Sequence, residues 1–299
     1  MQENEGGRFT LLGDRGPGML LAIDVGNTQT VMGLFDGHGS SNDLAGGYQP
    51  GGDMPGLVHH WRVATVVDRT ADEHALLITQ LLALEGLQAA DCVGGIAVAS
   101  SVPRVTGSLR EMSRRRFHVP TVIVEPGVRT GVSILYDNPK EVGADRIANA
   151  VGAFDLYGGP CIVVDLGTAT TLDAISPSGA YLGGAIVPGI EISLDALFEH
   201  AAALRRIELV APRSVIGKST VESMQSGAVF GFTAQIDGLC ERFEKVLGKS
   251  VIVSTGGLAE LVTPLSERIQ HREPWLTLHG LRLIYRRNVG SGPPEAWPA

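Results

Sequence analysis

One short pattern occurs twice in this chain of 299 residues and limits the folds that the chain can adopt. Residues 22–30 read AIDVGNTQT, and residues 163–171 read VVDLGTATT. Each copy is an apolar run that ends in Asp, followed by a Gly and by hydroxyl or amide side chains. One copy lies at the start of each half of the chain. Similarity on this scale indicates duplication, so we predict two similar domains that face a cleft.

The repeated pattern also predicts a chemistry. An Asp at the end of a buried strand places its carboxylate at the edge of the sheet, and the Gly that follows lets the backbone approach a ligand closely. Successive N–H groups in such a turn form a concave site for anions, and Thr and Asn side chains add donors to phosphate oxygens. Because a carboxylate repels phosphate, a cation must lie between them, which indicates Mg²⁺. Two ordinary hairpin turns are the alternative, and the duplication favours phosphate binding over it.

Strands that alternate with helices predict an α/β architecture whose later strands are mostly parallel. The strands expected in the first half span residues 20–25, 30–35, 93–99 and 121–125, and the first two form a hairpin. The helices expected there span residues 103–117 and 141–157, and a third begins with a capping box at residues 70–73. In the second half we expect strands at residues 161–165, 170–175 and 251–254 and helices near residues 191–204 and 219–247. A second capping box, formed by Ser219 and Glu222, opens the last of these helices.

We divide the chain at residue 150 into two domains. The N-terminal domain spans residues 19–150 and the C-terminal domain residues 151–288, with a disordered extension at residues 1–18 and a tail at residues 289–299. Met19 stands directly before the first strand, and the sequence leaves open whether it is the true start. Residues 37–57 are rich in Gly, Ser, Asp and Pro, which predicts a mobile surface loop.

Charge and cysteine usage exclude several classes of partner. The net charge of −8 at pH 7 repels phosphate backbones, so we expect no nucleic-acid partner. The densest basic run, residues 114–116, is more typical of a solvated helix face than of an anion site. The cysteines stand far apart and show neither metal-ligand nor disulfide spacing, which favours a reducing, cytoplasmic compartment. Residues 1–18 lack an apolar signal sequence, and no apolar run reaches the ~18 residues of a membrane helix, so we expect no membrane contact.

The better-known phosphate motifs are missing. Gly217-Lys218-Ser219 resembles the end of a P-loop, but the first glycine of that motif would fall at Pro212, so a loop before a capped helix is favoured. No G-x-G-x-x-G follows the first strand. A third glycine element, STGGLA at residues 254–259, follows a strand and opens a helix. It could pack against an adenine or a ribose, or it could be a plain connection, and both interpretations stay open.

Five segments together resemble the type III pantothenate kinases, of the actin/sugar-kinase/heat-shock ATPase superfamily. These segments are LAIDVGNT at residues 21–28, NPKEVGADR at 138–146, DLGTATT at 165–171, GAIVPG at 184–189 and TGGLA at 255–259. The resemblance extends from Met19 to about Asn288. It implies an α/β fold of two duplicated ribonuclease-H-like (actin-like ATPase) domains, with mixed sheets flanked by helices. It also implies ATP-dependent phosphorylation of pantothenate to 4'-phosphopantothenate, the first step of coenzyme A biosynthesis.

The resemblance implies a role for each matching residue. The ATP-binding residues it implies are Asp24, Val25, Gly26, Asn27, Thr28, Gln29, Thr30 and Val31, together with Thr168, and Asp24 lies near Mg²⁺ directly or through water. The pantothenate-binding residues it implies are Tyr136, Gly143, Ala144, Asp145 and Arg146, and Thr220 reaching across a homodimer interface from the other subunit. Asp165 is expected to bind a monovalent cation, K⁺ or NH₄⁺. Gln29 stands where the family often has Asn, a change that keeps donor and acceptor.

The resemblance makes Asp145 the proton acceptor for the pantothenate hydroxyl. Because an alcohol is too weak an acid for a carboxylate to ionise beforehand, Asp145 would orient the hydroxyl and accept its proton late. Arg146 would present its planar fork to the pantothenate carboxylate. From the residues alone, an ion pair between Asp145 and Arg146 at a helix start is the alternative. Helix capping equally explains Thr220, and a half-buried loop position equally explains Tyr136.

Two other functions stay open at this point. Another small-molecule kinase, or a phosphatase, could use the same cleft in the same fold. Some proteins of the resembled family have also been described as accessory transcription factors, so a catalytically silent regulator is the third possibility. The sequence opposes that reading, because every proposed catalytic residue is present, the net charge is acidic and no helix-turn-helix pattern stands out.

Overall fold

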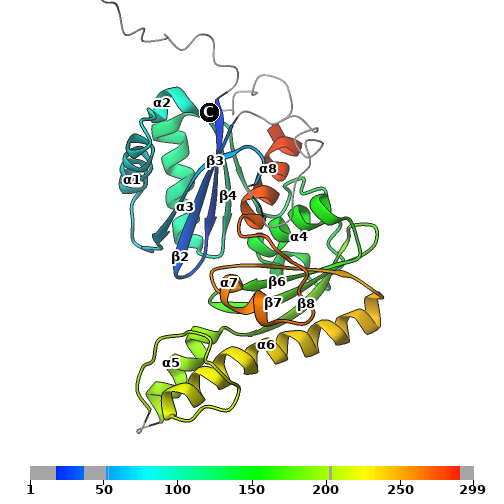
Figure 1. Ribbon diagram of the computed structural model, residues 1–299. Helices are drawn as coiled ribbons and strands as arrows, with labels where there is room; N and C mark the ends of the chain where they lie inside the picture. Colours follow the sequence, from blue (N-terminus) through cyan, green and yellow to red (C-terminus); the bar gives the residue numbers. More distant parts are fainter. Residues whose placement is uncertain (1–17, 37–51, 53, 202–203, 290–299) are drawn as a thin grey trace, which may run out of the picture.

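The computed structural model describes residues 18–36, 52, 54–201 and 204–289 (Figure 1). Most of the predicted extension, of the loop predicted at residues 37–57 and of the predicted tail therefore lies outside the described residues. Leu57, which the sequence placed in that loop, instead begins a strand.

Two five-stranded sheets form the framework, and they share one strand order. The first contains, in order across the sheet, β3 (Leu57–Ala64), β2 (Gln29–Phe35), β1 (Met19–Val25), β4 (Val93–Ser100) and β5 (Thr121–Ile123). The second contains β8 (Tyr181–Pro188), β7 (Ala169–Ile175), β6 (Cys161–Leu166), β9 (Val251–Thr255) and β10 (His271–Arg272). In each sheet the first three strands of the chain pair antiparallel and the last two join in parallel. The shared order and directions confirm the predicted duplication.

Helices cover the outer faces of both sheets and fill the space between them (Figure 1). They are α1 (Ala71–Leu84), α2 (Ala89–Cys92), α3 (Pro103–Met112), α4 (Ala144–Tyr157), α5 (Ile190–His200), α6 (Thr220–Leu247), α7 (Ala259–Val262) and α8 (Leu276–Val289). The outer face of the first sheet packs on α1 and α3, and that of the second on α5, α6 and α7. None of the helices described here has both the length and the apolar character needed to cross a membrane.

The alternation of side chains along the first strand of each sheet decides where its Asp points. The outward-facing apolar side chains are Leu21, Ile23 and Val25 in β1 and Ile162, Val164 and Leu166 in β6. Ala22 and Val163 face the opposite way, into the core between the sheets. Because successive residues of a strand point to opposite faces, Asp24 and Asp165 also face the space between the sheets. The duplicated acids are therefore directed at one region.

Helices α4 and α8 hold the two sheets together, because each packs on the sheet of the other half of the chain. Helix α4 follows the first sheet in the chain and packs on β6 of the second, whereas α8 follows the second sheet and packs on β1 and β4 of the first. Their backbones come very close, since a Cβ at Gly280 would lie 1.9 Å from the carbonyl oxygen of Ala148. A Cβ at Gly152 would lie 2.8 Å from the carbonyl oxygen of Leu276. Glycine is therefore required on both sides of this contact.

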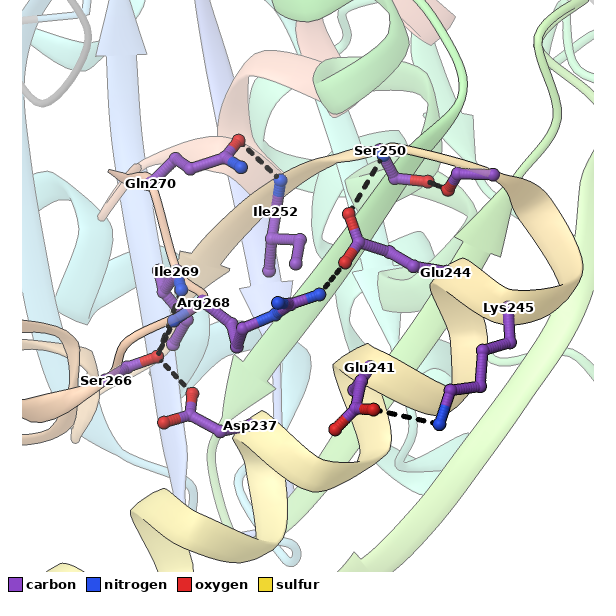
Figure 2. A network of polar contacts seen from close by, with 11 residues as sticks. Asp237, Glu241, Glu244, Lys245, Ser250, Ile252, Ser266, Arg268, Ile269 and Gln270 are labelled. Atoms are coloured by element: carbon purple, nitrogen blue, oxygen red, sulfur yellow. Dashed lines mark hydrogen bonds and ion pairs between the residues drawn. The ribbon is translucent and has the colours of Figure 1, made fainter.

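The long helix α6 is fastened at its C-terminal end by polar contacts to the segment after α7 (Figure 2). The Glu244 carboxylate pairs with Arg268 and also accepts from the Ser250 N–H at 3.1 Å. About two turns earlier in α6, Asp237 accepts from the hydroxyl of Ser266. These contacts fix α6 against the second sheet from one end, while its other end projects with α5 (Figure 1).

Most predicted elements are confirmed, with shifted ends. The capping box of Thr70 and Glu73 opens α1 as expected. The helix predicted at residues 103–117 is α3 followed by a π-helical turn over Ser113–Phe117. The helix predicted from residue 141 begins only at Ala144, after a 3-10 turn over Pro139–Glu141. Helix α4 runs across residue 150, and the domain division there stays a prediction.

Five of the helices and strands were not predicted: β3, α2, β8, β10 and α8. Strand β3 contains two adjacent histidines and follows a Gly-rich segment, and its side chains alternate only between exposed and half-buried positions. The sequence therefore gives a weak signal for this strand.

The prediction of the second capping box is wrong for one of its two hydrogen bonds. Ser219 does accept from the Glu222 N–H at 3.2 Å, but the Glu222 carboxylate accepts from the Lys218 N–H at 2.8 Å. The backbone before Ser219 turns so that the Lys218 amide is the one within reach.

Acid should destabilise the fold by protonating His74. This residue lies on the buried face of α1, one turn before Ile78. Burial, aided by Arg69 and opposed by Glu73, lowers the pKa of His74 to about 4. Since the unfolded chain keeps a pKa of about 6.5, stability is complete above that pH and is lost as the pH falls toward 4. We expect the free energy of unfolding to drop by about 2 kcal/mol between pH 7 and pH 5 through this residue.

Urea denaturation of the wild type and of His74→Leu at both pH values measures this loss. The variant should lack most of it, whereas His200→Leu, a change at an exposed histidine of α5, should retain it. An equal loss in His74→Leu and wild type would contradict the assignment.

Candidate active site

The two duplicated hairpin turns meet in the folded chain. Thr28 lies in the turn between β1 and β2, and Thr168 lies in the turn between β6 and β7. Their hydroxyl oxygens are 3.0 Å apart, although 140 residues separate them in the sequence. The two halves of the chain therefore meet at these turns.

The first turn is held from behind by Thr65, the residue after β3. Its N–H donates to the Thr28 carbonyl at 2.9 Å, and its hydroxyl donates to the Gly26 carbonyl at 2.8 Å. The hydroxyl also lies 2.9 Å from that of Thr30. Of the predicted ATP-binding residues, Asn27, Thr28 and Gln29 are exposed at the tip, whereas Val25 is buried in the outer core. Thr30 is buried and Val31 half-buried, so the sheet holds these two.

Three half-buried carboxylates gather beneath the turns: Asp24 at the end of β1, Asp165 at the end of β6 and Asp145 in the first turn of α4. Burial, then the charges of Asp145 and Asp165, raise the pKa of Asp24 well above its ordinary value. Burial, then the charge of Asp145, raise the pKa of Asp165 to about 7. The three groups therefore repel one another, and a cation would relieve that repulsion.

The donor set fits a cation that is shared with a ligand. Carboxylate oxygens are the ligands that Mg²⁺ prefers, and in nucleotide sites it usually takes one or two of them together with phosphates and waters. Among the described residues, no three acidic, histidine or cysteine side chains converge closely enough to hold an ion unaided. The arrangement therefore suits a metal that arrives with a polyphosphate.

Asp145 is oriented by its own helix. Its Oδ1 accepts from the N–H of Arg146 at 2.8 Å. A Cβ at Gly143 would lie 2.4 Å from that Oδ1, so the glycine leaves the space that the carboxylate occupies. The side-chain ion pair between Asp145 and Arg146, the alternative reading of the sequence, is not formed among the described residues, since the guanidinium of Arg146 turns to Asp173.

Arg146 and Asp173 form a buried ion pair beside Asp145. Arg146 donates to Asp173 Oδ1 from Nε at 2.8 Å and from Nη2 at 2.6 Å, and the Tyr181 hydroxyl donates to the same oxygen at 2.8 Å. Burial lowers the pKa of Arg146, but the hydrogen bond and charge of Asp173 outweigh it and leave that pKa above its ordinary value. Burial raises the pKa of the Asp173 carboxyl, and the hydrogen bond and charge of Arg146 oppose that rise. Tyr136 is exposed beside this group, with its ring centre 6.3 Å from that of Tyr181.

Two glycine motifs border the second turn. Gly256, in the third glycine element, has φ 91°, and a Cβ there would lie 2.6 Å from Asp165 Oδ1. Gly189 donates its N–H to the Thr168 carbonyl at 3.2 Å, and a Cβ there would lie 2.2 Å from the same oxygen. Both glycines thus allow backbone to close against the turn.

Thr220 lies apart from the other predicted site residues. It is the exposed first residue of α6, and α6 covers the outer face of the second sheet. Asp145 and Arg146 stand on α4, which packs on the inner face. One chain therefore does not bring Thr220 to the predicted pantothenate site.

Comparison with known proteins agrees with this geometry. The family model described as type III pantothenate kinase matches residues 20–242. A type III pantothenate kinase from Streptomyces griseus is 54% identical over 279 residues, which cover 91% of this chain and 99% of that protein. This chain belongs to the type III pantothenate kinase family.

Solved structures similar to this member of the type III pantothenate kinase family show the fold. A Baf family protein from Campylobacter jejuni, described as a transcriptional activator, gives a TM-score of 0.53 at 18% identity and covers 89% of this chain and 98% of its own. A ROK family protein from Streptococcus pneumoniae, solved with sucrose, gives a TM-score of 0.50 at 12% identity and covers 90% and 98%. The predicted fold class of two duplicated actin-like ATPase domains is confirmed.

Sequence reasoning missed several residues at the site of this kinase family member. Arg62 in β3 donates from Nη1 to Gln29 Oε1 at 2.8 Å, and its charge lowers the pKa of Asp24 against the larger effects that raise it. Asp173 had a usable signal, because a lone acid stands inside an apolar strand pattern. Arg62 had none, since its strand was not predicted. Asn149, which donates to Asp165 Oδ2 at 2.9 Å, reads as an ordinary helix residue.

Removing the charge of Asp173 should strongly destabilise this kinase fold. Asp173→Asn leaves the Arg146 guanidinium buried without its counter-charge, and we expect a loss of about 3 to 5 kcal/mol in the free energy of unfolding. The matched control is Asp195→Asn, which breaks an exposed pair with Arg206 and should cost at most about 1 kcal/mol. Urea denaturation measures both, and equal losses would show that the buried pair has no special weight.

Proposed function

We propose that this chain transfers the γ-phosphate of ATP to pantothenate, giving 4'-phosphopantothenate in the first step of coenzyme A biosynthesis. The observation that carries the proposal is membership of the type III pantothenate kinase family, at 54% identity to a relative across 91% of the chain. The apposed turns above an acidic cluster support it. Phosphoryl transfer depends mostly on positioning and on neutralised charge, and this arrangement offers both.

We assign the ATP phosphates to the two turns. Asn27, Thr28 and Gln29 lie at the exposed tip of the first turn and Thr168 at that of the second, where their side chains can reach phosphate oxygens. Val25 and Val31 would contribute through their backbone, because the sheet holds their side chains. The contact between Thr28 and Thr168 supports a site that closes on the nucleotide from both halves.

Two cations belong to the proposal. Asp24 would hold Mg²⁺, directly or through water, together with phosphate oxygens, and the bound Mg²⁺ would neutralise charge on the transferring group. Asp165 would hold K⁺ or NH₄⁺ at the second turn. The mutual repulsion of the carboxylates supports both assignments.

Asp145 would accept the proton of the pantothenate hydroxyl as the new O–P bond forms. The Arg146 N–H holds Oδ1, so Oδ2 is the oxygen that we assign to the proton. A carboxylate that is oriented in advance can guide the hydroxyl in line with the γ-phosphate and take its proton late. Catalysis at this residue therefore rests on its position more than on its basicity.

The pantothenate site would lie beside Asp145, between Tyr136 and the start of α4 at Gly143 and Ala144. Arg146 uses Nε and Nη2 on Asp173, so Nη1 is the donor that we assign to the pantothenate carboxylate. The ring of Tyr136 would form a wall of this site, because it is exposed next to Tyr181.

A homodimer would complete the site with Thr220 of the second subunit. Support comes from an apolar groove between α5 and α6, which is lined by Leu194, Leu197, Met224 and Phe232 and also by Thr220. A second subunit covering this groove would bury apolar surface that one chain leaves in water. We also place the reaction in the cytoplasm, because the spacing of the three cysteines indicates no disulfide framework, as suits a reducing compartment.

Replacing Asp145 should abolish turnover without unfolding the chain. Asp145→Asn keeps the shape and the Oδ1 acceptor but removes the proton acceptor, so kcat should fall by about 10² to 10⁴. A coupled assay with ATP, Mg²⁺, K⁺ and pantothenate measures it. Asp91→Asn, an exposed change on α2, should keep the wild-type rate. Full activity of Asp145→Asn would remove Asp145 from the mechanism, and phosphate release without pantothenate would indicate a phosphatase.

Replacing Arg62 should weaken the use of ATP. Among the described residues, the Arg62 guanidinium is the cation that acts on Asp24, so Arg62→Ala should lower kcat/KM for ATP by about 10²- to 10³-fold, the effect of removing one electrostatic donor. Arg62→Lys should lose less, since a point charge remains without the planar fork. Arg104→Ala, which removes an exposed arginine of α3, is the control. Equal kinetics of Arg62→Ala and Arg104→Ala would place Arg62 outside the nucleotide site.

A further inference from the structure

The side chain of Asn149 bridges Asp165 to the C-terminal helix. Asn149 stands in α4 and is fully buried. Its Nδ2 donates to Asp165 Oδ2 at 2.9 Å, and its Oδ1 accepts from the Thr277 hydroxyl at 2.7 Å. Thr277 is also buried, and 128 residues separate it from Asn149 in the chain. A continuous buried path of hydrogen bonds therefore links α8 to a carboxylate of the acidic cluster.

The hydrogen-bonding character of these groups makes Thr277 the residue that sets the orientation of the Asn149 amide. When Asp165 binds a cation it is ionised and can only accept hydrogen bonds, so the amide must then present its NH₂ end to Asp165. With the amide reversed, its oxygen would face a carboxylate oxygen, and two buried acceptors would oppose each other. A hydroxyl that donates to Asn149 Oδ1 favours the productive orientation. The amide then holds one oxygen of Asp165 in place.

The other oxygen of Asp165 is also confined. A Cβ at Gly256 would lie 2.6 Å from Asp165 Oδ1, so the third glycine element closes against that oxygen with no side chain between them. With Oδ2 engaged by Asn149, Oδ1 is the oxygen that remains for a ligand at the second turn. The plane of the carboxylate is therefore fixed from two directions.

Helix α8 is itself fitted to the other half of the molecule. A Cβ at Gly33 of β2 would lie 2.7 Å from the side chain of Leu278, the residue after Thr277. A Cβ at Gly95 of β4 would lie 2.0 Å from the hydroxyl oxygen of Tyr285. The first sheet thus sets the position of Thr277, although Thr277 acts through Asn149 on Asp165 of the second sheet.

We propose that Thr277 is a positioning residue whose hydroxyl, through the Asn149 amide, orients the Asp165 carboxylate toward the monovalent cation and the nucleotide. This inference rests on the proposed function, in which Asp165 holds that cation. Residues that orient a metal ligand typically contribute about 10- to 100-fold to metal affinity or activity. Residue 277 also lies beyond residues 20–242, which the family model matches.

The test compares Thr277→Val, which removes the hydroxyl and keeps the shape, with Thr277→Ser, which keeps the hydroxyl. The matched control is Thr233→Val, because Thr233 is likewise a buried helical threonine, and its hydroxyl donates to the Val229 carbonyl within α6 at 2.8 Å. In the coupled assay, the K⁺ concentration for half-maximal activation should rise about tenfold in Thr277→Val. It should stay within about twofold of wild type in Thr277→Ser and Thr233→Val.

A second readout is independent of turnover. Calorimetry of a non-hydrolysable ATP analogue with Mg²⁺, at several K⁺ concentrations, should show that the enhancement by K⁺ is largely lost in Thr277→Val and kept in Thr233→Val. Combining Thr277→Val with Asp165→Asn should add no further loss, because no carboxylate remains to be oriented. If Thr277→Val does not fold, Thr277→Ala also removes the hydroxyl and carries the same expectation.

The outcomes separate this inference from the proposed function. Unchanged K⁺ dependence in Thr277→Val, or equal losses in the two valine variants, would overturn the positioning role while pantothenate phosphorylation by the wild type stands. A wild type without any response to K⁺ would also overturn it. A wild type whose analogue binding responds to K⁺, but which does not phosphorylate pantothenate, would overturn the proposed function and leave the positioning of Asp165 intact.

Discussion

The close backbone contact where α4 and α8 cross is the constraint on which the rest of the molecule depends. At this contact Gly280 touches the carbonyl of Ala148 so closely that no side chain fits. Each helix is thereby held against the sheet that it does not follow in the chain. Because α4 is fixed there, its first turn carries Asp145 to the ends of β1 and β6, where Asp24 and Asp165 already point inward. The site is thus a consequence of how two helices pack.

The polar groups around this contact fall into two electrostatic classes. Arg146 and Asp173 compensate each other inside the chain, with Tyr181 as a further donor, so this part is complete in itself. Among the described residues, the carboxylates of Asp24, Asp145 and Asp165 form no such ion pair, and the pKa values of Asp24 and Asp165 are raised by burial and by neighbouring charge. Fold stability elsewhere must offset their repulsion. A polyphosphate with its cation would convert this repulsion into binding energy, which explains why a kinase keeps it.

The sequence predicts what is local or repeated and misses what is assembled from distant segments. The hairpin at Asp24 and its copy at Asp165 could be read because strand, acid and glycine are adjacent in the chain. The capping box at Thr70 could be read for the same reason. Arg62 could not, because it enters the site only through the pairing of β3 with β2, and β3 carries exposed polar residues typical of an edge strand. Asn149 and Thr277 could not either, since their contact exists only after α4 and α8 have crossed.

The duplication also explains why a helix at the far end of the chain reaches the site. Helix α4 follows the fifth strand of the first sheet, and α8 follows the fifth strand of the second, so the two helices hold equivalent places in the two halves. Asp145 is the second residue of α4, and Thr277 is the second residue of α8. The two positions could not both carry an acid. A carboxylate at residue 277 can only accept hydrogen bonds, so it would reverse the Asn149 amide and turn an oxygen toward Asp165. Equivalent places in the two copies therefore require opposite hydrogen-bonding character, an acceptor on α4 and a donor on α8.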